Sequence, residues 1–149
     1  MNRVQAGIVM AAAVLLFGCA ASGPKLAEMQ SSIPALKSNQ GRIYFYRSSS
    51  MMGAAIQPNI LLNGQVVGES KPGGFFFVDT KPGPQEVSTS TEVEKKLTFT
   101  LEPGQTRYVR TTISFGVIAG RVQPELMDRS TGDKELAETS YIGKPVSQR

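Results

Sequence analysis

From residue 41 onward, apolar and polar positions alternate with a period of two, in short runs separated by turn residues. Leu97, Phe99 and Leu101 alternate with threonines, which is typical of a strand with one buried and one solvated face. Asn63-Gly64 between two apolar runs predicts a two-residue type I′ hairpin, because both residues tolerate positive φ. The expected strands are 42–47, 59–62, 65–68, 74–80, 85–91, 97–101, 105–115 and 120–128.

This spacing of short strands and Gly/Pro turns predicts an all-β fold, a single antiparallel β-sandwich of about seven or eight strands. Residues 132–139 are expected to form a short closing helix. The sequence therefore divides into a β-sandwich domain at residues 41–143 and a C-terminal tail at 144–149.

The first residues have the layout of a secretory signal peptide, assigned to residues 1–18. Arg3 supplies a positive start, and Ala6 to Phe17 carry no charge. As a helix this stretch would span about 18 Å, which is too short for a hydrocarbon core of about 30 Å. Residues 19–40 are small, polar and punctuated by proline, and we interpret them as a flexible tether with a helical turn around 25–30.

Leu16-Phe17-Gly18-Cys19 resembles the bacterial lipobox, and Cys19 is the only cysteine of the chain. The resemblance implies a diacylglycerol on the Cys19 sulfur, cleavage before Cys19 and acylation of the new amino group. Ala20, in place of the Asp that the enterobacterial sorting scheme uses for inner-membrane retention, implies the outer membrane facing the periplasm. The inner membrane and the cell surface are alternative locations. The alternative to the lipobox is an ordinary signal peptide with a chance cysteine, which the position of the single Cys disfavours.

Four segments together resemble a family of short bacterial envelope lipoproteins that is classed as a domain of unknown function. They are Gly41–Arg47, Leu62–Gly68, Phe76–Val78 and Lys81–Gly83. The family is similar to the PEGA-type surface β-sandwiches, and the likeness covers residues 41–143. It implies a fold and an envelope location, and it brings no catalytic residues.

Composition excludes several classes of function. The chain has no His, so imidazole bases, His-containing triads and His metal sites are excluded. Its carboxylates are isolated in the sequence and it has no G-x-S-x-G elbow. The formal charge is +4 without a run of Lys or Arg that would resemble a nucleic-acid footprint. We therefore expect no enzyme activity, no cofactor, no metal site and no nucleic-acid partner.

Two candidate contact sites remain. The uncharged loop that holds Met51, Met52 and Ile56 is apolar where a connection is normally wet. Because Met-rich surfaces adapt to varied partners, it is a candidate docking loop for another envelope protein or for lipid. The alternative is that the loop folds back to plug the open end of the sandwich.

The second candidate is a surface of aromatic and basic side chains that could grip a sugar or an anion. Tyr44 and Tyr46 share one face of their strand, as do Tyr108 and Arg110. The alternative is an ordinary solvated strand face.

The sequence thus predicts a lipid-anchored, non-catalytic interaction or structural module of the cell envelope. Its partners would be the membrane, through acyl chains on Cys19, and an envelope protein or cell-wall component. The alternative function is a periplasmic binding protein for a glycan or lipid fragment. A concave pocket lined by the tyrosines and arginines would favour that alternative, whereas a filled sandwich with an exposed apolar loop would favour the module.

Overall fold

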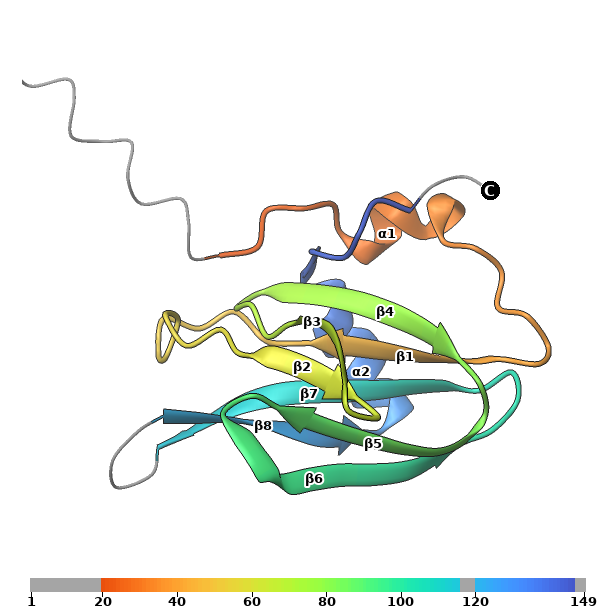
Figure 1. Ribbon diagram of the computed structural model, residues 1–149. Helices are drawn as coiled ribbons and strands as arrows, with labels where there is room; N and C mark the ends of the chain where they lie inside the picture. Colours follow the sequence, from red (N-terminus) through yellow and green to blue (C-terminus); the bar gives the residue numbers. More distant parts are fainter. Residues whose placement is uncertain (1–19, 116–119, 147–149) are drawn as a thin grey trace, which may run out of the picture.

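The chain forms two packed β-sheets, and the computed structural model describes residues 20–115 and 120–146 (Figure 1). The strands are β1 (Gly41–Tyr46), β2 (Asn59–Leu62), β3 (Gln65–Glu69), β4 (Gly74–Thr80), β5 (Gly83–Thr89), β6 (Glu92–Leu101), β7 (Thr106–Phe115), β8 (Gly120–Met127) and β9 (Ser140–Tyr141). The helices are α1 (Leu26–Met29), the 3-10 turn η1 (Gln30–Ser32) and α2 (Arg129–Ala137). The all-β sandwich predicted from the sequence is confirmed.

One sheet has the strand order β8-β7-β1-β4-β9 and the other β3-β2-β5-β6. The expected hairpin joins β2 to β3, with φ of 51° at Asn63 and 81° at Gly64. The five-stranded sheet also contains two parallel pairs, β1 with β7 and β4 with β9, so it is mixed rather than wholly antiparallel. Parallel neighbours need a long crossover, and here the chain passes through the second sheet before β7 and through α2 before β9.

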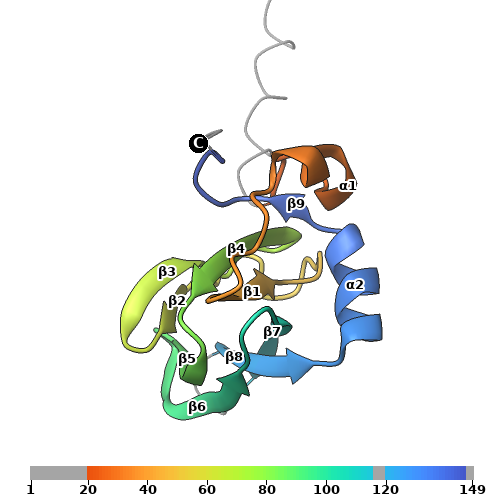
Figure 2. The same cartoon turned by 90° about the vertical axis from the view of Figure 1, so that its right-hand side faces the viewer.

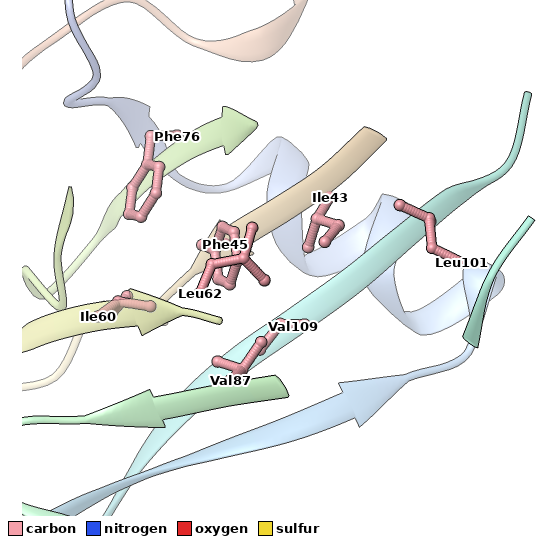
Figure 3. Close-up of a cluster of buried hydrophobic side chains, with 8 residues drawn as sticks. All are labelled: Ile43, Phe45, Ile60, Leu62, Phe76, Val87, Leu101 and Val109. Carbon is pink, nitrogen blue, oxygen red and sulfur yellow. The ribbon is translucent and has the colours of Figure 1, made fainter. Parts of the chain in front are cut away.

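The main core lies between the two sheets (Figure 3). Phe45 of β1 and Phe76 of β4 are paired in register, and their rings stack with centroids 5.1 Å apart. The buried members of this core are Ile43, Phe45, Ile60, Leu62, Phe76, Val87, Leu101 and Val109. Side chains fill the space between the sheets here, as in an ordinary sandwich.

Helix α2 covers the outer face of the five-stranded sheet (Figure 2). It begins earlier than predicted, because the Asp128 side chain caps it by accepting a hydrogen bond from the Thr131 backbone N–H at 2.9 Å. Gly132 lies directly on the Tyr108 ring and Leu136 is fully buried. Strand β1 is therefore buried on both faces.

The segment before β1 is also part of the domain. The Ala21 N–H donates to the Pro72 carbonyl at 3.2 Å, and the Tyr141 N–H donates to the Pro24 carbonyl at 2.8 Å. Lys25 forms an isolated bridge with Ser140 of β9. These hydrogen bonds tie the segment to the sheet on which β9 lies.

Apolar side chains explain why residues 21–34, which were expected to lie in a flexible tether at 19–40, are instead packed on the domain. Leu26, Met29 and Ile33 recur at helical spacing, and Met29 is buried against the outer face of the sheet while the other two are partly buried. Residues 21–34 therefore belong to the folded domain rather than to a flexible spacer. The expected helical turn near residues 25–30 is confirmed as α1.

Candidate interaction surface

The loop between β1 and β2 carries the most exposed apolar side chains of the described chain. Met51 is 92% exposed and Met52 is 64% exposed. This loop lies at the left end of the sandwich in Figure 1, where β7 also ends and β8 begins. Neither methionine plugs the end of the sandwich, so the loop offers an apolar contact surface to its surroundings.

The buried side chain of Arg47 fixes the backbone conformation of this loop. Its guanidinium donates hydrogen bonds to the backbone carbonyls of Gly53 at 2.9 Å, Ile56 at 2.6 Å and Ser70 at 3.1 Å. Arg47 is only 3% exposed, and burial lowers the pKa of its guanidinium from the usual value. Because a buried cation is costly unless it is hydrogen-bonded, these carbonyls and Arg47 stabilise one another and fix the loop.

Strand β7 continues the apolar surface. A Cβ placed on Gly53 would lie 2.9 Å from the Ile113 side chain, so the loop backbone packs directly on β7. Ile113 and Phe115 share one face of the strand because they are two residues apart, and Phe115 is 61% exposed. Ile56 turns inward and packs on Gly120, the register partner of Phe115.

We refer to these five residues, Met51, Met52, Ile56, Ile113 and Phe115, as the apolar end. Five large hydrophobic side chains are exposed in the part of the chain that the structure describes, and three of them belong to this set. Of the three residues of the predicted docking loop, Met51 and Met52 are exposed, whereas Ile56 is partly buried and packs inward on Gly120. Sequence reasoning missed Phe115, although its place as the last apolar residue of an alternating strand was a usable signal.

The structure does bring together the four residues of the predicted ligand surface, but it places them beneath α2. Tyr44 and Tyr108 stack with ring centroids 5.7 Å apart, and both are buried. Tyr46 is 2% exposed, and Arg110 is partly buried beside it. These side chains therefore form the contact between sheet and helix, although Tyr108 also lines a hollow of about 470 Å³ and Arg110 lines a separate one of about 230 Å³.

Carboxylates of α2 complete this buried contact. The Tyr46 hydroxyl donates to Glu135 Oε2 at 2.6 Å, and the Tyr108 hydroxyl donates to Asp133. Burial, and then the neighbouring carboxylate, raise the pKa of both tyrosines above the usual value. Arg110 pairs with Glu135 at 2.8 Å, so the helix is held by hydrogen bonds and charge as well as by packing.

A hollow of about 750 Å³ lies between the segment before β1 and the C-terminal residues. Ile33, Phe77, Tyr141 and Val146 are among the residues that line it. None of the four residues of the predicted ligand surface is among them. This hollow therefore differs from the surface of tyrosines and arginine that the sequence predicted for a small ligand.

Metal-binding clusters and membrane-spanning helices are absent from residues 20–115 and 120–146. No three Asp, Glu, Cys or His side chains gather there in a way that could hold a metal ion. Within the same ranges, no helix has both the length and the apolar character needed to cross a bilayer. Cys19, the predicted lipidation site, lies outside the described residues.

Together these features define a small all-β sandwich with one helix-covered sheet and one apolar end. Residues 37–122 match the family described as "Protein of unknown function (DUF2846)", and the chain belongs to this family. The expectation of a domain of unknown function is thereby confirmed, whereas the lipoprotein assignment and the likeness to PEGA-type domains remain predictions.

The chain is also similar to a curated protein of Haemophilus influenzae that bears the name "Uncharacterized protein". The two are 27% identical over 135 residues, which cover 87% of this chain and 79% of the relative. No solved structure matches the chain.

Proposed function

We propose that this protein is a lipid-anchored lipoprotein of the bacterial envelope that acts as a non-catalytic interaction module. Lipid on Cys19 fixes its location, and the apolar end makes contact with an apolar partner. The observation that carries the proposal is the pair of exposed methionines on a loop that the buried Arg47 holds in place.

The chemistry of the apolar end supports a contact role. Contiguous exposed apolar side chains on a small domain mark surfaces that bind proteins, membranes or ligands. Methionine side chains are flexible and polarisable, so they adapt to the shape of a partner. The hydrogen bonds of Arg47 order the backbone beforehand, which lowers the entropy that binding costs.

The anchor rests on the sequence Leu16-Phe17-Gly18-Cys19. One acyl chain gives reversible membrane binding, whereas two or more give stable attachment. A diacylglycerol and an amide-linked chain on Cys19 would therefore hold the protein permanently, with the outer membrane facing the periplasm as the proposed location.

Fractionation of bacterial cells that express the full chain tests the anchor. We expect wild-type protein in the membrane fraction, with an intact mass that shows cleavage before Cys19 and added acyl chains. Cys19→Ser should abolish the added mass and release the protein from the membrane. Mature wild-type protein with an unmodified thiol that washes freely from membranes would overturn the proposal.

Photo-crosslinking in intact cells tests the contact surface. A photoreactive residue at position 52 should give crosslinked adducts, whereas one at position 66 should give few. Met52 and Val66 are matched in exposure, at 64% and 61%, but only Met52 belongs to the apolar end. Equal adduct yields at the two positions would remove the apolar end from the proposed function and leave the anchor unaffected.

A further inference from the structure

The first described residues lie close to the apolar end. Ala21 is hydrogen-bonded to the Pro72 carbonyl, and the next residue, Gly73, lies against Ser49: a Cβ on Gly73 would be 3.6 Å from the Ser49 Cβ. Ser49 precedes Met51 by two residues. The chain therefore joins the domain at the end that carries the exposed methionines, as Figure 1 shows at its left side.

The distance from the anchor to the domain is short. Cys19 precedes Ala21 by two residues, and two extended residues span at most about 7 Å. Residues 21–34 are packed and hydrogen-bonded rather than free, so they add no reach. A domain attached in this way is held at the membrane surface with its point of attachment next to the bilayer.

We propose that the apolar end rests on the membrane that holds the anchor, with Met51, Met52 and Phe115 inserted into the lipid interface. This inference rests on the proposed lipid at Cys19, and it names the bilayer as the partner of the apolar end. The domain would then stand on its apolar end, in one orientation, instead of swinging on a tether.

The opposite end of the sandwich carries exposed charged side chains. The turns at 81–83 and 102–105 lie there, next to each other across the start of β1 (Figure 1). Lys81 and Glu102 are exposed in these turns. Insertion of this end would bury charges, whereas insertion of the apolar end buries methionine and phenylalanine side chains.

Proximity favours lipid over a protein as the occupant. Because the anchor and the apolar end belong to one molecule, the bilayer is present at a high effective concentration at all times. A protein partner would have to displace that contact. Glu69, Lys71 and Lys144 line a hollow near the attachment point, so a weak attraction to anionic head groups would add to the contact made by the exposed apolar side chains.

Tryptophan fluorescence tests the inference directly, because the chain contains no tryptophan. Met52→Trp places a reporter in the apolar end, and Val66→Trp is the control of matched exposure. Phe115→Trp, a conservative exchange, is a second reporter in case Met52→Trp does not fold. Each variant, in its mature lipidated form, is reconstituted into vesicles of phosphatidylethanolamine and phosphatidylglycerol, with and without brominated acyl chains.

The reference for each reporter is the same Trp variant carrying Cys19→Ser, in buffer without detergent. Relative to that reference, we expect the emission of Trp at positions 52 and 115 to shift to shorter wavelength when the lipidated protein is in vesicles. Brominated lipids should quench these two reporters strongly and leave the Val66→Trp reporter nearly unquenched. Flotation of the vesicles reports the anchor separately from the orientation.

The outcomes separate the two proposals. Protein that does not float with vesicles contradicts the anchor and with it the proposed function. Protein that floats, yet shows equal quenching at positions 52, 115 and 66, overturns only the inference that lipid contacts the apolar end. That second result, combined with crosslinks from position 52 to a protein in cells, would make a protein the occupant instead.

Discussion

The two faces of strand β1 show how differently one strand can be buried. Ile43 and Phe45 point into the core between the sheets, where they belong to a cluster of buried apolar side chains. Tyr44 and Tyr46 point the other way, beneath α2, and the Tyr46 hydroxyl reaches a carboxylate of that helix. Burial alone therefore does not distinguish the faces. The contacts of the inner face are stabilised by close packing of apolar side chains. The contacts of the outer face also depend on tyrosine hydroxyl groups, which form hydrogen bonds with residues far away in the sequence.

Removal of a large inner side chain should have the largest effect. Phe45→Ala deletes a fully buried ring that stacks on Phe76, and it should lower the free energy of unfolding by about 3–5 kcal/mol. Urea titration followed by circular dichroism measures this. Tyr44→Phe is the control on the opposite face, and it should change stability little because the ring remains. A similar loss in both variants would contradict the assignment of Phe45 to the main core.

Widening the contact under α2 should have the next largest effect. Gly132→Ala places a methyl group against the Tyr108 ring, so the helix must shift from the sheet, at a cost of about 1–3 kcal/mol. Alanine would otherwise favour the helix by about 1 kcal/mol relative to glycine, so the sign of the change is informative. The exposed Lys134→Ala is the control in the same helix. Stabilisation by Gly132→Ala would show that the helix does not approach the sheet closely.

Loss of one polar tip on the outer face should cost less. Tyr46→Phe removes the hydrogen bond to Glu135 but leaves Glu135 paired with Arg110 at 2.8 Å. We expect the free energy of unfolding to fall by about 1–2 kcal/mol. Tyr141→Phe is the matched control, since the Tyr141 hydroxyl donates only to an exposed backbone carbonyl. Equal, negligible effects in the two variants would argue against a stabilising role for the carboxylate.

The smallest effect is a dependence on alkaline pH. The folded state raises the pKa of Tyr46 and Tyr108, so an unfolded tyrosine loses its proton near pH 10 while the folded one keeps it. The folded state then holds more protons, and stability falls as the pH rises above about 10. Tyr46→Phe should make this decline shallower between pH 9 and about 11 in urea titrations. An unchanged slope would contradict the raised pKa of Tyr46.

Local patterns predicted most of the fold. Alternation located the strands and separated Tyr44 and Tyr46 from Ile43 and Phe45, and Asn63-Gly64 marked the hairpin. The local sequence did not indicate which element packs on each face of strand β1. Glu135 lies 89 residues after Tyr46, so the strand pattern alone left a solvated face and a helix-covered face equally consistent with the sequence.

Some features of the apolar end could also be predicted from the local sequence, and others could not. Met51 and Met52 stood out because uncharged residues are unusual in a connection, and their exposure supports that interpretation. The role of Arg47 was hidden, because its partners are backbone carbonyls, which leave no mark in the sequence. Leu26, Met29 and Ile33 were a readable helical pattern, but proline and small residues around them favoured the interpretation as a tether.

The contact between the segment before β1 and strand β9 has a consequence for the order of folding. The Tyr141 N–H donates to the Pro24 carbonyl, and Lys25 forms a bridge with Ser140, so stretches far apart in the sequence meet here. Because contacts between distant residues cost more loop-closure entropy, the edge of the larger sheet next to β4 should be completed late in folding. A chain truncated before residue 140 would leave the segment around residues 24–25 without the strand on which it docks.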